Sequence, residues 1–512
     1  MRRKELKGLG YKVITYKTCE IEKWLKQEEF RDMKESFKEE DNMVGRLMPR
    51  NLFFGGRTGC SRIYYNCDQS ENIRYLDVTS LYPYINRSTP YPLGVPKVIR
   101  GNELVQPTFG TKLEYRGFIQ CSVFPPRKLL HPVLPARARG NLVFGLCRTC
   151  MHGDSQTVCT HNNAERCLYG EWTHDEINYA LEHGYRIKRI YEVWHWDRWS
   201  GERGEPNIFA DYVNMFLKGK QESSGYPLVN GAEMSEEQKS AYRKDYAEKE
   251  GVHLDEKLIV RNEGLRYMNK LMLNSLWGKT GENADHAKVV FTKTHQEFDK
   301  IAWDRDLKIT SVTPLSDEIL MVRFKKCEEA LECTKNGSLP LAIYTTSAAR
   351  LHLLRILNQL GERVLYYDTD SVIFVEKVGE QLLDDQISSY LGDLTDEIEK
   401  GTIRRFVAPG PKQYAYVVEL DDGTIEKTVV KLRGFTLDHK AAQVITFDAM
   451  EAAAKEFMMT GRVQKPLMTT RTQMRRSNLT TIQTLVQNKV YEPVNNKGII
   501  DPLTGIVHPF GF

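Results

Sequence analysis

The chain has 512 residues, of which 41% are hydrophobic and 27% charged, and its formal net charge is +4. This length suits about three domains of roughly 150 residues each, with a sizeable buried core. No apolar run reaches the ~18 residues of a membrane span, and the first residues lack the apolar stretch of a secretory signal, so we expect an intracellular protein that is neither secreted nor membrane-bound. Ten cysteines are too dilute for a disulfide scaffold, which favours reduced thiols or a metal site.

Strand and helix signals alternate along the chain. The predicted elements are, in chain order, a strand over 74–77, helices over 173–183, 263–279 and 345–360, and a hairpin over 363–375. Gly, Pro and polar residues concentrate at 125–126, 201–206 and 335–340, and these stretches are the candidate boundaries between lobes.

Three aspartates stand where predicted strands end. Asp77 closes the first strand, and Asp368 and Asp370 lie in the tight turn of the hairpin. If these strands pair in one sheet, the three carboxylates can share two divalent cations, and Mg²⁺, with Mn²⁺ as a substitute, prefers such oxygen ligands. Aspartates are also common in turns for backbone reasons, which is the competing interpretation of the hairpin taken alone.

The helix over 263–279 carries the opposite charge. Arg266, Lys270 and Asn274 recur every four residues and therefore share one face, which can bind a polyphosphate. Lys220 extends this cationic row from a preceding helix. We expect the apolar side chains to turn towards a core; they are Leu265, Met268, Met272 and Leu276. The alternative is an ordinary solvent-facing helix, although Gly278 within it indicates close approach by another group.

A second motif lies between Asp77 and the Asp368–Asp370 turn. Cys147 and Cys150 form a Cys-x-x-Cys pair, and Cys159 and His161 follow as Cys-x-His. Four such ligands suit a closed, tetrahedral, structural zinc site, with Cys167 or His152 as substitute ligands. The alternative interpretation is a loop with four reduced residues.

Cations cluster after position 461. Only Glu492 and Asp501 oppose them, so this surface can track a phosphate backbone, or it can be a solvated basic tail. The basic residues are Arg462, Lys465, Arg471, Arg475, Arg476, Lys489 and Lys497.

Three segments resemble motifs A, B and C of family B DNA polymerases. They are Asp77-Val78-Thr79-Ser80-Leu81-Tyr82-Pro83, the stretch from Lys270 through Asn274-Ser275-Leu276-Trp277-Gly278, and Tyr366-Tyr367-Asp368-Thr369-Asp370-Ser371. Phe53-Phe54-Gly55-Gly56-Arg57 is similar to the Tyr-x-Gly-Gly segment of the protein-primed branch, and Lys412-Gln413-Tyr414 to its Lys-x-Tyr motif. The resemblance is closest to polymerases of Polinton (Maverick) elements, adenoviruses and related phages, and it runs from about position 50 to 436.

The resemblance implies an α/β (α+β) right-hand fold with a palm built on an antiparallel sheet, helical fingers and a thumb. The implied parts are a connecting segment (1–49), palm (50–87 and 339–445), an inserted lobe similar to a terminal-protein-binding region (88–205), fingers (206–283), a second, smaller insertion (284–338) and thumb (446–512). No Asp-x-Glu station of a proofreading exonuclease precedes position 50. We therefore expect no proofreading, and a chain that is a truncated part of a longer polymerase.

Site roles also follow from the resemblance. Asp77 and Asp370 would be the principal magnesium ligands, with Asp368 in support, and Tyr82 would exclude a 2′-hydroxyl. The implied nucleotide-binding residues are Ser80, Leu81, Tyr82, Lys220, Arg266, Lys270, Asn274 and Gly278. The implied primer- and DNA-binding residues are Gly55, Gly56, Arg57, Thr369, Ser371, Lys412 and Tyr414. Trp277 departs from the family pattern, which has Tyr there, so the ring is kept and the hydroxyl is lost.

The implied activity is DNA-directed DNA synthesis with dNTPs on primer-template DNA, for replication of a viral or transposon genome in the nucleus or at a viral replication site. A terminal protein is the implied primer. Two other classes compete with this prediction. A metal-dependent nuclease also clusters carboxylates but needs neither the Lys270 helix nor the Tyr82 ring, and a silent DNA-binding remnant would have lost a carboxylate.

Overall fold

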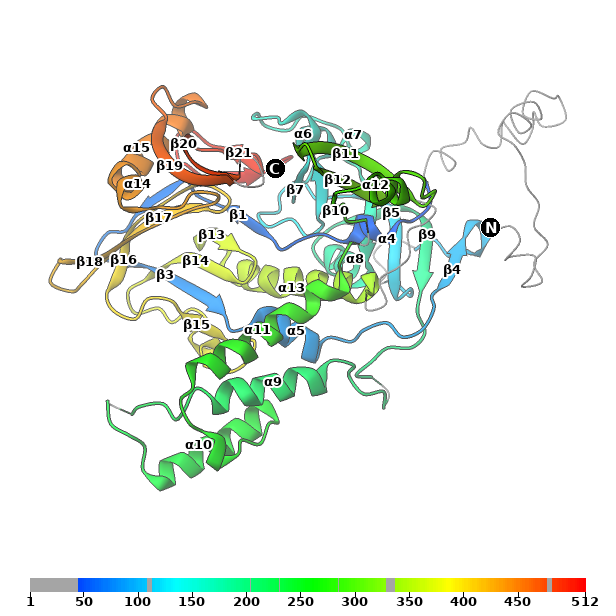
Figure 1. Ribbon diagram of the computed structural model, residues 1–512. Coiled ribbons are helices and arrows are strands. Elements are labelled where there is room, and N and C mark those ends of the chain that lie inside the picture. Colours follow the sequence, from blue (N-terminus) through cyan, green and yellow to red (C-terminus); the bar gives the residue numbers. More distant parts are fainter. Residues whose placement is uncertain are drawn as a thin grey trace.

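The computed structural model describes residues 45–107, 113–202, 204–229, 231–283, 285–327, 337–476 and 481–512 (Figure 1). The predicted connecting segment over 1–49 lies almost wholly outside these residues. Of the second predicted insertion, 284 and 328–336 also lie outside them.

A nine-stranded antiparallel sheet, which we call the central sheet, lies on the left in Figure 1. Its main path runs β1-β13-β14-β3-β16-β17-β18, with β15 on β3 and β2 on β16. The strands are β1 (Thr58–Cys60), β2 (Tyr64–Asn66), β3 (Glu71–Val78), β13 (Val364–Asp368), β14 (Ser371–Lys377), β15 (Leu394–Asp396), β16 (Thr402–Gly410), β17 (Gln413–Glu419) and β18 (Ile425–Leu432). The predicted strand over 74–77 and the predicted hairpin over 363–375 are confirmed, and the two are neighbours in this sheet.

Two helices pack on one face of the sheet. They are α5 (Leu81–Ser88) and α13 (Leu339–Leu360), and they share a core in which Leu353 and Leu357 meet Leu76 and Phe374. The predicted helix over 345–360 is present but begins earlier, at Leu339. Pro340 lies in its first turn, where proline is favoured because the backbone N–H there has no partner within the helix. Gly361 ends it, with a positive φ of 58°.

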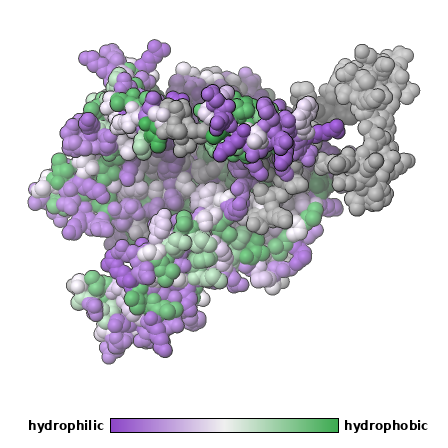
Figure 2. All heavy atoms as spheres, in the orientation of Figure 1, coloured by the Kyte–Doolittle hydropathy of each residue, from purple (hydrophilic) through white to green (hydrophobic). Residues whose placement is uncertain are grey.

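Three helices project from the sheet at the bottom of Figure 1. They are α9 (Ala210–Glu222), α10 (Glu236–Glu250) and α11 (Glu263–Thr280), so the predicted helix over 263–279 is confirmed. The expectation that its apolar stripe is buried was wrong for three of the four side chains, whereas Leu276 is partly buried. Leu265, Met268 and Met272 are 53%, 52% and 36% exposed, and Leu273 is the side chain that enters a core, against Val213 and other residues of α9. Figure 2 shows green, hydrophobic surface in this region.

The inserted lobe lies beside the sheet, on the right in Figure 1. Its elements are β4 (Lys97–Arg100), β5 (Gly117–Phe124), β6 (Ala136–Ala138), β7 (Asn141–Val143), α6 (Arg148–Gly153), α7 (Asn163–Arg166), β8 (Leu168–Thr173), α8 (His174–Glu182) and β9 (Arg186–His195). The short helix α4 (Pro49–Leu52) precedes β1 in the chain and contacts β8. Thr173 caps α8 in a capping box with Glu176, as the predicted helix over 173–183 requires. The strands β4, β9, β5 and β8 form one sheet over the largest hydrophobic core.

Two smaller parts complete the described chain. The second insertion is a three-stranded sheet with one helix: β10 (Lys288–Thr292), α12 (His295–Ala302), β11 (Leu307–Ser316) and β12 (Ile319–Lys326). The last part holds α14 (His439–Val444), α15 (Phe447–Thr460), β19 (Leu467–Arg476), β20 (Ile482–Tyr491), β21 (Gly498–Ile500) and β22 (Val507–Pro509). Short 3-10 helices span Gly101–Glu103, Glu256–Leu258, Gly361–Arg363 and Asp384–Gln386. None of the helices in the described residues is long and apolar enough to cross a membrane.

Candidate active site

The three aspartates meet at one end of the central sheet. Asp77 lies opposite Ser371 in the register of β3 and β14, and the amide of Val78 donates to the carbonyl of Asp370 at 2.7 Å. The turn between β13 and β14 is tight, because the amide of Asp370 donates to the carbonyl of Asp368 and Thr369 adopts a left-handed φ of 63°. Strands that are far apart in the sequence thus bring Asp77, Asp368 and Asp370 to the same end of the sheet, as predicted.

These carboxylates crowd negative charge. Burial and the neighbouring charge of Asp370 raise the pKa of Asp77 to about 7, and burial and the charge of Asp368 raise the pKa of Asp370 to about 6. Glu397, which follows β15, adds to both shifts, and no sequence pattern pointed to it. A set of hard oxygen donors with too few nearby cations fits Mg²⁺, and Asp77 and Asp370 are the residues that would hold it.

Asp368 differs from the other two because a lysine already neutralises it. The Nζ atom of Lys412 lies 2.7 and 2.9 Å from the two carboxylate oxygens of Asp368. The hydroxyls of Tyr366 and Thr369 also donate to this carboxylate, at 3.3 and 3.1 Å. The geometry is consistent with the predicted supporting role of Asp368, and it adds Tyr366, whose hydroxyl also accepts the amide of Lys412.

Lys220, Arg266 and Lys270 lie near one another, and Lys270 lies near Asp77. Burial, followed by the charges of Arg266 and Lys270, lowers the pKa of Lys220, so the three cations lie close enough to repel one another. Lys270 also opposes the upward shift in the pKa of Asp77, which places its charge next to the acidic site. Asn274 is exposed on the same helix, and, apart from the neighbouring residues and backbone of that helix, no described atom lies within 4 Å of where a Cβ on Gly278 would stand. The close approach expected at Gly278 is therefore made by no described side chain, and the space there is open.

Tyr82 lies between the acidic site and the projecting helices. Its ring stacks on Trp277 of α11, with centroids 4.5 Å apart and planes 13° from parallel. Ser80 has a left-handed φ of 54° and begins α5. The side chain of Leu81 is 1% exposed and belongs to the core beneath α5, so its predicted contact with a nucleotide is corrected to one that only its backbone can make.

A cleft of about 680 Å³ lies at the same end of the sheet. Gly55, Gly56, Thr369 and Lys412, which come from three distant segments, all line it. Gly56 packs closely on Thr369, because a Cβ at position 56 would stand 2.8 Å from the Thr369 side chain and would require that side chain to move. Tyr414 lies nearby in an aromatic cluster, and its hydroxyl is 3.3 Å from the hydroxyl of Tyr75.

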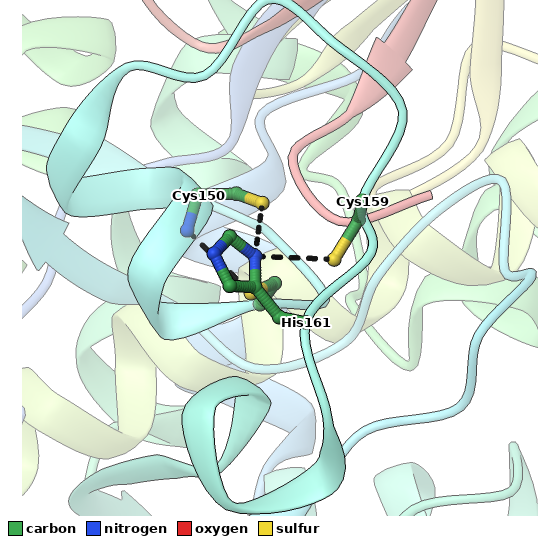
Figure 3. A group of neighbouring side chains, drawn as sticks. Cys150, Cys159 and His161 are labelled. Carbon is green, nitrogen blue, oxygen red and sulfur yellow. Dashed lines mark hydrogen bonds between the residues drawn. The ribbon is translucent and has the colours of Figure 1, made fainter.

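The Cys/His cluster forms in the inserted lobe (Figure 3). Cys147, Cys150, Cys159 and His161 place their ligand atoms within 4.8 Å of one another. The Nδ1 atom of His161 is 3.6 Å from the Cys147 sulfur, 3.3 Å from that of Cys150 and 3.6 Å from that of Cys159. Cys167, a predicted substitute, instead contacts the carbonyl of Leu168, and His152 is also outside the cluster.

The comparisons with known proteins agree with this geometry. Residues 25–228 match the family model described as DNA polymerase type B, organellar and viral. Phi29 DNA polymerase complexed with primer-template DNA superposes with a TM-score of 0.51 at 14% identity, over 90% of this chain and 66% of that one. The chain has a DNA polymerase fold. A second Phi29 DNA polymerase structure, a ternary complex with DNA and incoming nucleotide, gives 0.50 at 15% identity, over 86% and 61% of the two chains.

Three curated proteins, each named probable DNA polymerase, are similar to this chain in sequence. A probable DNA polymerase of Neurospora intermedia is 25% identical over 71% of this chain and 31% of its own length. One of Agaricus bitorquis is 22% identical over 76% of this chain and 42% of its own length. The chain thus spans about a third of the length of the curated relatives it matches.

Two of the predicted DNA contacts need correction. Arg57 is 1% exposed, donates to the carbonyls of Pro132 and Val133, and lies 3.7 Å from the centre of the Phe144 ring. Its side chain therefore joins the segment that precedes β1 to the inserted lobe. Ser371 is 6% exposed, and its hydroxyl donates to the carbonyl of Asp368. Neither side chain is free to contact a primer, because each already fills a buried position.

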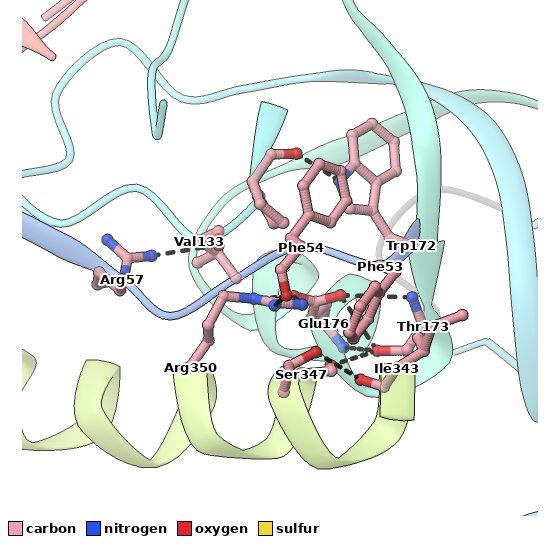
Figure 4. Close-up of polar contacts among 12 residues, drawn as sticks. Phe53, Phe54, Arg57, Val133, Trp172, Thr173, Glu176, Ile343, Ser347 and Arg350 are labelled. Atoms are coloured by element: carbon pink, nitrogen blue, oxygen red, sulfur yellow. Dashed lines mark hydrogen bonds and ion pairs between the residues drawn. The ribbon is translucent and has the colours of Figure 1, made fainter. Parts of the chain in front are cut away.

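Sequence reasoning missed a buried ion pair that holds the Gly-Gly segment (Figure 4). Arg350 of α13 donates to the carbonyls of Phe54 and Gly55 at 2.9 and 3.1 Å and pairs with Glu176 of the inserted lobe at 2.7 Å. Both charged side chains are about 2% exposed. An arginine in a helical pattern carries no signal of such a role, which depends on which loop packs against the helix.

Proposed function

We propose that this chain is a template-directed DNA polymerase that adds deoxynucleotides to a primer 3′-hydroxyl. One observation carries the proposal: Asp77 and Asp370 converge from separate strands and face the charge of Lys270. A metal-dependent nuclease also clusters carboxylates, but it does not need the facing lysine. All three aspartates are present, which a catalytically silent remnant would not require.

Each group in the site has a part in nucleotidyl transfer. Lys220, Arg266 and Lys270 would bind the triphosphate, since fixed cations are its strongest partners. Magnesium ions held by Asp77 and Asp370 would supply Lewis-acid activation of the primer hydroxyl and offset charge on the departing pyrophosphate.

The remaining groups would choose and hold the substrates. Tyr82, held by its stack on Trp277, would fill the space that a 2′-hydroxyl needs. The cleft with Gly56 and Lys412 would receive the primer end, and primer-template DNA and dNTPs are the corresponding partners.

The biological setting is part of the same proposal. The motifs resemble those of protein-primed enzymes of Polinton elements, adenoviruses and phages, and a lobe is inserted between the two carboxylate stations, where such enzymes bind a terminal protein. We infer replication of a viral or transposon genome, with a terminal protein as primer and synthesis in the nucleus or at a viral replication site.

Extension of a labelled primer on a defined template tests the activity. With Mg²⁺ and dNTPs we expect template-dependent lengthening of the primer, and without dNTPs an unchanged primer. Shortening of the primer in the absence of dNTPs would instead indicate a nuclease, and no change in either reaction would indicate a silent DNA-binding protein.

We also propose that the Cys/His cluster holds a structural zinc ion. A tetrahedral site with Zn–S of about 2.3 Å and Zn–N of about 2.05 Å has sulfur-to-nitrogen edges of about 3.6 Å. The three sulfur-to-Nδ1 distances of His161, 3.3 to 3.6 Å, match those edges. Hydrogen bonding does not account for them, because one ring nitrogen has a single proton or a single lone pair and cannot serve three thiols.

Metal analysis of the purified protein tests this site. We expect about one zinc per chain in the wild type, because the four ligands form a closed set. Cys159→Ser should lose the zinc, and Cys167→Ser, which changes a cysteine outside the cluster, should keep it. A wild-type protein purified without chelator that contains no zinc, or a Cys159→Ser variant that retains it, would contradict the assignment.

A further inference from the structure

The segment 494–512, which we call the strap, crosses the molecule from the primer cleft to the Cys/His cluster. It begins at the turn that carries Lys412. There the side chain of Gln413 donates to the carbonyl of Val494 at 2.8 Å, and Gly410 packs so closely on that carbonyl that a Cβ would collide with it. Val494, Asn496 and Lys497 line the same cleft as Gly56 and Lys412. The strap is therefore one wall of the proposed primer site.

The middle of the strap lies along the edge of the central sheet. The Nζ atom of Lys497 donates to the carbonyl and the hydroxyl of Thr58 in β1, at 2.9 and 2.7 Å. Further on, the amide of Val507 donates to the carbonyl of Ser61, and the amide of Ile63 donates to the carbonyl of Gly505, both at 2.8 Å. The strap thus covers the edge that β1 would otherwise expose.

The far end of the strap is seated against the cluster. The amide of Leu146 donates to the carbonyl of Phe510 at 2.6 Å, and Phe510 is fully buried in the core of the inserted lobe. Gly511 has a positive φ of 88°, and a Cβ on it would collide with Cys147. Figure 1 shows this end of the chain close to α6, which begins with the Cys-x-x-Cys segment.

One arginine joins the cluster to the strap. Arg166 is 2% exposed, and its Nη1 atom donates to the sulfur of Cys159 at 3.3 Å and to the carbonyl of Gly511 at 2.8 Å. Its other described contact is the carbonyl of Pro126, so its described partners include no carboxylate. Arg166 thus bridges the cluster and the strap, and three thiolates with one Zn²⁺ carry a net charge of −1, which compensates its positive charge.

We infer that the zinc site is a latch that fastens the strap and thereby holds the wall of the primer cleft in place. This inference rests on the proposed zinc site. With zinc bound, Arg166 is neutralised by the thiolates and keeps its bond to Gly511, and Cys147 is fixed at the position on which Gly511 packs. Without zinc, both contacts lose their support, and the strap is free to leave the inserted lobe.

Hydrogen exchange of the full chain tests the latch independently of polymerase activity. In Cys159→Ser we expect the amides of residues 505–511 to exchange at least about tenfold faster than in the wild type, since local opening becomes easier. Amides of β3 and β14 should keep their protection, which shows that the chain still folds. Cys167→Ser is the matched control and should exchange like the wild type throughout.

A second variant separates the latch from its metal. Gly511→Ala changes a residue of the strap and none of the zinc ligands. We therefore expect this variant to retain zinc and still show faster amide exchange over 505–511. It should also release labelled primer-template DNA faster in a competition assay, by about tenfold, because the cleft loses a wall. Zinc loss with unchanged strap exchange would overturn the latch while leaving the zinc site standing, and a wild-type chain without zinc would overturn the zinc site itself. Unchanged DNA release in Gly511→Ala with a freed strap would overturn the link to the cleft.

Discussion

Asp370→Asn is expected to lower the rate of nucleotide addition by at least about 10²- to 10³-fold, the cost typical of removing one preorganised charge stabiliser. The substitution keeps the size of the side chain and removes its negative charge. Asp370 is the carboxylate that the β13–β14 turn presents next to Asp77, and Lys412 is paired with Asp368 instead. The variant should therefore lose a metal ligand and keep its fold. Single-turnover primer extension with Mg²⁺ and dNTPs measures the effect.

Asp421→Asn is the matched control, because this substitution makes the same chemical change away from the site. Asp421 is exposed and lies between β17 and β18 of the same sheet. It should extend primers at the wild-type rate. Near-normal extension by Asp370→Asn would contradict the assignment of the acidic site, whereas equal losses in both variants would point to a general effect on folding.

Tyr82→Val is expected to relax the choice between deoxynucleotides and ribonucleotides. Removing the ring opens the space in which a 2′-hydroxyl would sit, so the preference for dNTPs should fall by about 10- to 200-fold, the range of discrimination that small shape differences in a pocket provide. The measurement is the ratio of kcat/KM for a dNTP to that for the matching ribonucleotide. Some loss of overall activity is also expected, since Trp277 loses the ring on which it stacks.

Tyr82→Phe is the informative control, because it keeps the ring and removes only the hydroxyl. If the ring is the obstacle, this variant should discriminate like the wild type. A Tyr82→Val variant that still rejects ribonucleotides would show that another group excludes the 2′-hydroxyl, and a Tyr82→Phe variant that accepts them would assign the selection to the hydroxyl.

Much of the architecture was predictable because its signals are local. The strand that ends at Asp77, the hairpin around Asp368 and Asp370, and the helix from Glu263 all occur where alternation, turn residues and helical spacing placed them. The Cys147, Cys150, Cys159 and His161 spacing likewise predicted side chains that do meet. Such patterns are short-range properties of the chain, so they survive whatever packs around them.

Most of the errors concern burial. Arg57, Leu81 and Ser371 belong to motifs, yet their side chains face a core, and most of the apolar stripe of α11 faces outward. A motif gives the position of a residue along the chain, whereas burial depends on which distant segment covers it. Arg350, Glu397 and Tyr366 were missed for the same reason, since each acquires its role from partners that are remote in sequence.

By itself, the sequence determined the types of chemical group available: three carboxylates at strand ends, a row of cations on one helix and four soft ligands at metal-binding spacing. Only the tertiary structure decided which of them act together. It places Asp77 beside Asp370 and pairs Asp368 with Lys412. It also positions the segment 494–512 between the primer cleft and the Cys/His cluster. The physical reason is that hydrogen bonds and ion pairs act over a few ångströms, so their partners are chosen by the packing of strands and lobes that the chain brings together from far apart.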